Sequence, residues 1–172
     1  MICNKRAMYH GVIQVWYKKK EENIVKTCVW QASNFVNKLK ANNANDFVLS
    51  VDYVACVLLG MARYMVPVLT NNKVGNGIVD TFLTTYLSSA SAEEQDNYAK
   101  EINNYYEIFC ETAAEKVEYL KTGVLSRKMA EVCAEQIAHS LGLSYEEGLA
   151  SNMIFYGIVT VVMKQICPDL VG

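Results

Sequence analysis

Apolar residues recur at helical spacing along nearly the whole chain, and this periodicity limits the fold more than any other feature. The clearest stripe advances in steps of three and four residues: Tyr98, Ile102, Tyr105, Phe109, Ala113, Val117 and Leu120. Such steps place every member on one face of an α-helix. Ser91 and Glu94 have the form of a capping box at its start, and Gly123 suits its end. The sequence therefore predicts a helix over 92–121.

A second segment, from 51 to about 71, is apolar on nearly every side. Ser50 is a plausible N-cap for it, and Asp52 in the first turn suits the helix dipole. A soluble helix with this profile belongs at the centre of a bundle. Its apolar members are Val54, Val57, Leu58, Met61, Tyr64, Met65, Val66 and Leu69.

Other segments predict further helices. An apolar stripe from Val12 to Leu39 contains the polar run KKKEEN at 18–23, which is either a turn between two helices or an exposed patch of one long helix. The Asn-rich run at 41–46 and the run NNKVGNG at 71–77 predict loops. Helices are also expected from 78 to 87, from 126 to 141, and from 144 to 166.

These elements predict an all-α fold. The chain has 2 Pro and 9 Gly, and no convincing strand alternation, so an all-β fold and disorder are both disfavoured. We expect a compact multi-helix bundle of five to seven helices around an apolar central helix. It would be one helical domain over 1–172, with 1–22 as a peripheral basic arm. So much apolar surface also predicts a homo-oligomer, with a dimer as the first choice.

Membrane insertion and secretion are not predicted. Asp52 and Arg63 interrupt the longest apolar stretch, and a charge within a span is costly. The first residues lack the form of a cleavable signal. None of the 6 cysteines forms a CxxC pair, so reduced, buried thiols and a cytoplasmic location are expected.

Charge is divided unevenly along the chain. Residues 1–90 contain ten Lys or Arg and five Asp or Glu, whereas 91–172 contain six and thirteen. The predicted outer face of the 92–121 helix is acidic, and it is a candidate surface for an unidentified protein partner: Glu107, Glu111, Glu115 and Glu118. A candidate basic arm precedes it: Lys18, Lys19, Lys20 and Lys26. Like charges four residues apart on a helix repel, so something basic should relieve the acidic face.

Residues 127–163 allow two interpretations, a helix-turn-helix or two core helices that meet at a turn. The second is favoured, because Gly148 and Ser151 stand where a helix-turn-helix needs apolar residues. Glu146 and Glu147 would also face DNA phosphates. The spacing of Arg127, Glu131, Glu135 and His139 puts them on one helix face. We interpret that face as an ion-paired outer stripe, since no second Glu–His pair completes a di-iron site.

No arrangement of residues indicates a catalytic site, a metal or a cofactor, so the chain is predicted not to be an enzyme. The first functional hypothesis is a non-catalytic protein-interaction or regulatory module. The second is a bundle that binds a small apolar ligand, lined by residues more typical of plain core: Met61, Tyr64, Met65, Tyr105 and Tyr106. The third is weak nucleic-acid binding, with aromatic side chains of the basic segment stacking on bases: Trp16, Tyr17 and Trp30.

Overall fold

The computed structural model describes the backbone of residues 3–42, 50–70, 75–113, 131–132, 135 and 162. Within the first helix, side chains are described for residues 19–38, 40 and 41. The described residues form four helices and contain no strand. This confirms the all-α class, although four is fewer than the five to seven helices predicted. The helices expected over 126–141 and 144–166 lie almost wholly outside the described residues.

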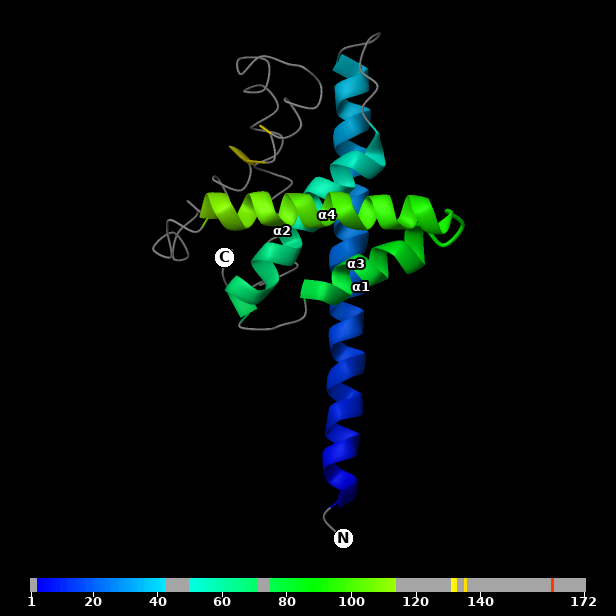
Figure 1. Ribbon diagram of the computed structural model, residues 1–172, viewed down its shortest axis with the longest axis vertical. Coiled ribbons are helices and arrows are strands. Elements are labelled where there is room, and N and C mark those ends of the chain that lie inside the picture. The colour runs from blue at the N-terminus through cyan, green and yellow to red at the C-terminus, as the bar shows by residue number, and fades with distance from the viewer. Residues whose placement is uncertain are drawn as a thin grey trace.

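Helix α1 (Cys3–Asn42) is one continuous rod. The run KKKEEN therefore belongs to a single helix, and the alternative of a turn at 18–23 is wrong. The run contains neither Pro nor Gly, and Lys and Glu are good helix formers. Buried side chains of α1 lie between Ile24 and Val36. Figure 1 shows its N-terminal part, in dark blue, extending past the other described helices.

Helix α2 (Val51–Thr70) lies at the centre. Its side chains from Val54 to Leu59 are all buried, and it packs on α1, α3 and α4. The predicted N-cap is present, because the backbone N–H of Asp52 donates to Oγ of Ser50 at 3.2 Å. An apolar helix in the middle of the described helices is thus confirmed. No helix in the described ranges has the length and apolar character needed to cross a membrane.

Helix α3 (Gly75–Tyr86) begins three residues earlier than predicted. The glycines assigned to a loop are part of its first turn. A Cβ at Gly77 would overlap the carboxylate of Glu21 from α1, so the end of the Glu21 side chain lies against the start of α3. A carboxylate is favourable there, because the first turn of a helix carries partial positive charge.

Helix α4 (Ala92–Ala113) crosses the front of the described helices in Figure 1. The predicted apolar stripe is buried at Ile102, Tyr105 and Phe109. The residues predicted to continue this helix, from 114 to 121, lie outside the described part of the chain.

Candidate protein-interaction surface

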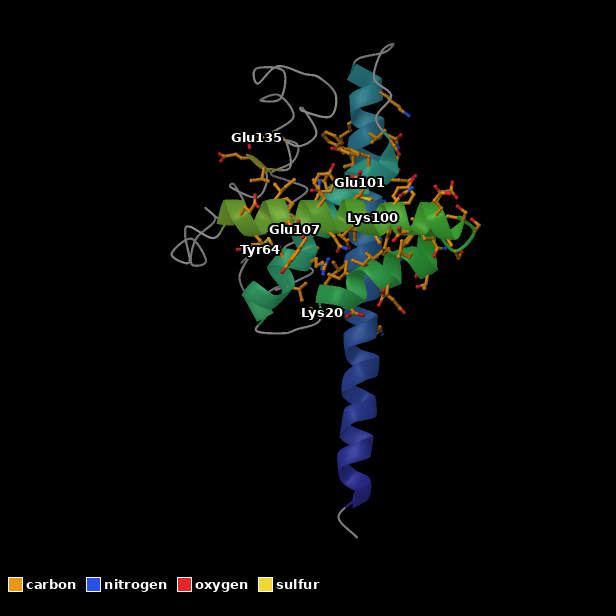
Figure 2. The ribbon with its side chains drawn as sticks, viewed as in Figure 1. Lys20, Tyr64, Lys100, Glu101, Glu107 and Glu135 are labelled. Carbon is orange, nitrogen blue, oxygen red and sulfur yellow. The ribbon has the colours of Figure 1, made fainter. Side chains whose placement is uncertain are left out.

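The solvent face of α4 is dense in carboxylates. Over Ala92–Ala113 the sequence contains six acidic residues and one Lys. All six acidic side chains are exposed and define what we call the acidic face of α4: Glu93, Glu94, Asp96, Glu101, Glu107 and Glu111. Figure 2 shows Lys100, Glu101 and Glu107 along this helix. Lys100 forms an ion pair with Asp96 at 2.6 Å, and exposed pairs of this kind contribute about 0–1 kcal/mol.

A close approach of backbones fixes α4 on α2. A Cβ built at Gly60 would lie 2.5 Å from Cβ of Tyr105 and 3.0 Å from the carbonyl oxygen of Ile102. Only a residue without a side chain fits there. Beside this contact, the rings of Tyr53 and Tyr105 meet edge to face, with centroids 5.8 Å apart. The buried face of α4 is therefore set, and its carboxylates must point away from α2.

Arg63 joins the two helices from the polar side. Its guanidinium lies 4.5 Å from the ring centroid of Tyr106, and it donates a hydrogen bond to Oδ1 of Asn103. Stacking and hydrogen bonding together hold the planar guanidinium of Arg63 in place. Arg63, one of the two charges that interrupt the apolar segment 51–69, thus takes part in a helix–helix contact. A hydrogen bond with Cys110 is the main cause that raises the pKa of Tyr106.

The start of α4 is held by the predicted capping box. The N–H of Glu94 donates to Oγ of Ser91 at 3.2 Å, and the N–H of Ser91 donates to the Glu94 carboxylate at 2.8 Å. The Ser91 hydroxyl also donates to this carboxylate at 2.9 Å, and the two bonds that the carboxylate accepts from Ser91 lower the pKa of Glu94. Gln95 adds a tie to the preceding turn, because its Nε2 donates to the carbonyl oxygen of Leu87 at 2.8 Å. The acidic face therefore begins at a well-anchored helix end.

Next to the start of α2, the hydroxyl of Tyr98 donates to Oδ2 of Asp52 at 3.4 Å. Partial burial, and after it the nearby Asp52 charge, raise the pKa of Tyr98. This bond is a second polar tie between α2 and α4. One polar contact with α4 lies before Gly60 along α2 and the other lies after it. Together they resist rotation of α4 relative to α2 as well as separation of the two helices.

Two of the four predicted partner-surface residues are placed by the structure. Glu107 and Glu111 are exposed on α4, whereas Glu115 and Glu118 lie outside the described residues. Sequence reasoning missed the acidic side chains near the start of the same helix, at 93, 94, 96 and 101. It considered the apolar stripe and the part of the helix from Glu107 onward, although helical spacing alone extends the polar face back toward the start of the helix.

The basic candidates lie on α1 rather than across α4. Lys19 and Lys26 are exposed and Lys20 is half-buried, while the side chain of Lys18 is outside the described set. The main packing partners of α1 are α2 and α3. The lysine-rich segment and the acidic face are thus on different helices that share α2 as their neighbour. The ionic relief expected from the sequence stays a prediction.

Residues proposed for other chemistry fall mostly in the core. Met61, Met65 and Tyr105 are buried, as expected for plain core, and the predicted apolar-ligand pocket stays a prediction. Cys28 and Cys56 are free, buried thiols, and Cys110 is free and half-buried. Within the described ranges, no group of three His, Cys, Asp or Glu could hold a metal ion. From the predicted stripe 127–139, only Glu131 and Glu135 are described.

Trp30 is the most unexpected side chain in the described part of α1. It is 61% exposed, although large aromatic side chains are usually covered. From the sequence, Trp30 was a candidate only for stacking on bases. A stronger signal was available, since Trp30 falls off the stripe formed by Ile24, Cys28 and Ala32. Its position therefore indicates the solvent face of α1.

Comparison of the chain with family models, curated proteins and solved structures gave no match.

Proposed function

We propose that this protein is a non-catalytic interaction module that binds a basic protein surface through the acidic face of α4. One observation carries the proposal. Six exposed carboxylates lie on a single helix, and α2 holds the opposite side of that helix by an interhelical contact that excludes a side chain at Gly60. A rigid element that displays charge loses little conformational freedom on binding, which favours specific association.

The charge pattern has an energetic cost in the isolated chain. Glu107 and Glu111 are one helical turn apart, and like charges at this spacing destabilise a helix by about 0.2–0.5 kcal/mol. A basic partner would remove this repulsion and also steer the encounter, since complementary potentials raise association rates. The acidic face therefore gains more from a partner than an evenly charged helix would.

The proposed setting is a reducing compartment such as the cytoplasm. Three described cysteines, Cys28, Cys56 and Cys110, are free thiols, and disulfides are rare where glutathione and thioredoxin act. Free thiols support this location but do not require it. Fractionation of the native host, with an antibody against the chain, tests the proposed location.

A charge-reversal experiment tests the function. The variant Glu107→Lys/Glu111→Lys changes two carboxylates of the acidic face. The matched control Glu22→Lys/Asp80→Lys makes the same change in net charge at exposed positions of α1 and α3. Tagged wild-type and variant chains are used to capture partners from the native host, and the proteins recovered are identified by mass spectrometry.

We expect the wild type and the control to recover the same basic protein and the α4 variant to lose it. Equal recovery by all three chains would contradict the proposal. Circular dichroism before capture shows whether each variant keeps the helix content of the wild type, so loss of binding is separated from loss of structure.

A further inference from the structure

The solvent face of α1 has the composition of a docking surface. A stripe of exposed side chains follows the helical period, and we call it the Trp30 stripe: Lys19, Asn23, Lys26, Trp30 and Asn37. Trp30, 61% exposed, is its large aromatic member. Tryptophan is among the residues most enriched at binding hot spots, where a polar rim surrounds an apolar anchor.

The charge of α1 indicates what would cover this stripe. Helix α1 contains eight Lys or Arg and two Glu. Two α1 helices placed back to back would bring like charges together, so pairing of the stripe with itself is disfavoured. An acidic helical surface is the complementary partner.

The acidic face of α4 has the required charge and shape. It lies on a helix of 22 residues with six acidic side chains and one Lys. Within one copy, the stripe and the acidic face lie on helices that pack mainly on other elements. The buried side of α1 packs on α2 and α3, the buried side of α4 packs mainly on α2, and each charged surface points away from its packed side. Figure 1 shows α4 passing across α1, so that the two helices run in different directions.

We propose that the Trp30 stripe of one copy docks on the acidic face of α4 of a second copy. This inference rests on the proposed function, because it names a second copy as the partner of the same acidic face. The two surfaces differ, so the contact is heterologous. Two such contacts close a reciprocal dimer where the geometry permits it, and otherwise copies add head to tail.

Tryptophan fluorescence reports the contact directly. The chain has 2 Trp, so Trp16→Phe leaves Trp30 as the sole tryptophan. As concentration rises, we expect its emission to move to shorter wavelengths together with an increase in mass measured by light scattering. Trp30→Ala should weaken self-association about tenfold or more, as expected for a hot-spot residue. A constant Trp30 emission and a constant mass across the dilution series would overturn the proposal.

Complementary charge variants make the test specific. One variant reverses the stripe, Lys19→Glu/Lys26→Glu, and the other places two lysines in the acidic face, Glu107→Lys/Glu111→Lys. The stripe variant alone should remain monomeric, because both of its surfaces are then acidic. The α4 variant alone should associate more weakly than the wild type, because its α4 face falls from six carboxylates and one Lys to four carboxylates and three Lys. An equal mixture should associate, since each variant supplies the surface that the other lacks. This recovery also shows that both variants are folded.

The outcomes separate this inference from the proposed function. If both variants self-associate as the wild type does, while the α4 variant loses its captured host protein, the second-copy inference fails and the proposed function stands. If the α4 variant keeps both its self-association and its captured host protein, the second-copy inference and the proposed function both fail. If the emission of Trp30 responds to an added oligonucleotide but not to protein concentration, the occupant is a nucleic acid and the inference is wrong.

Discussion

At the residue scale, two residues of α2 explain how a mostly apolar helix positions a charged one. Gly60 allows backbone contact with α4, and Arg63 stacks on Tyr106 beside it. The sequence predicted that α2 is central, because its apolar pattern has no polar face. It did not predict these two contacts, because a single glycine inside a helix and a single arginine do not form a pattern at helical spacing.

Gly60→Ala is expected to destabilise the protein. In an open helix this change would stabilise by up to about 1 kcal/mol through helix propensity. Here the new Cβ would lie 2.5 Å from Cβ of Tyr105 and 3.0 Å from the backbone of Ile102, so helices α2 and α4 must separate. Overpacking of this kind costs about 1–3 kcal/mol. Chemical denaturation measures it, and a variant more stable than the wild type would show that the contact is loose.

Thiol reactivity should follow burial. Burial raises the pKa of Cys56 to about 12 from an ordinary value of 9.0, so near neutral pH its thiolate fraction falls about a thousandfold. Burial also raises the pKa of Cys28. Under native conditions at mildly alkaline pH, iodoacetamide should modify the half-buried Cys110 before either of them. Peptide mapping after timed quenching measures the order, and denatured protein is the control in which all three react.

At the element scale, the capping box, the central helix and the stripe of α4 follow from sequence alone because each depends on local spacing. The junctions between elements do not. The run KKKEEN is compatible with a turn or a helix, and tertiary packing of Ile24 and Cys28 favours the helix. The start of α3 was misplaced because its glycines resemble a loop until Glu21 is brought beside Gly77.

A double-mutant cycle tests the junction between α1 and α3. Glu21→Ala removes the carboxylate beside the first turn of α3, and such an interaction contributes about 0.3–1 kcal/mol. Gly77→Ala displaces the same carboxylate, since the new Cβ would overlap it. The two changes should therefore cost less together than their sum, by about 0.5 kcal/mol or more. Additive costs in urea denaturation would place Glu21 away from α3.

The start of α4 should give the protein a measurable acid sensitivity. Hydrogen bonds from Ser91 lower the pKa of Glu94 below its ordinary value of 4.5. The ionised carboxylate therefore stabilises the folded state above that value, and this contribution is lost as pH falls through the lowered pKa. Comparison of thermal unfolding at neutral and acid pH measures the loss. Glu94→Gln keeps an acceptor for the Ser91 N–H and should lose less stability on acidification.

At the scale of the whole molecule, the protein keeps its opposite charges on separate helices. The sequence predicted this division, because the first half is basic and the second half acidic. It also led to the expectation that something basic relieves the acidic face. Among the described helices, α1 and α4 both pack on α2, since the apolar faces of α1 and α4 decide which sides are buried. Burial of apolar surface outweighs exposed ion pairs, which contribute about 0–1 kcal/mol each.

This separation predicts opposite responses to salt. Added NaCl, from about 0.05 M to about 0.5 M, shortens the range of charge interactions. Association between the basic stripe and the acidic face should weaken, as measured by light scattering. The unfolding free energy of the dilute monomer should stay constant or rise slightly, because the added salt screens the repulsion between Glu107 and Glu111. If association and the unfolding free energy both fell as salt was added, the charges would stabilise the fold itself. The acidic face would then be explained without a partner.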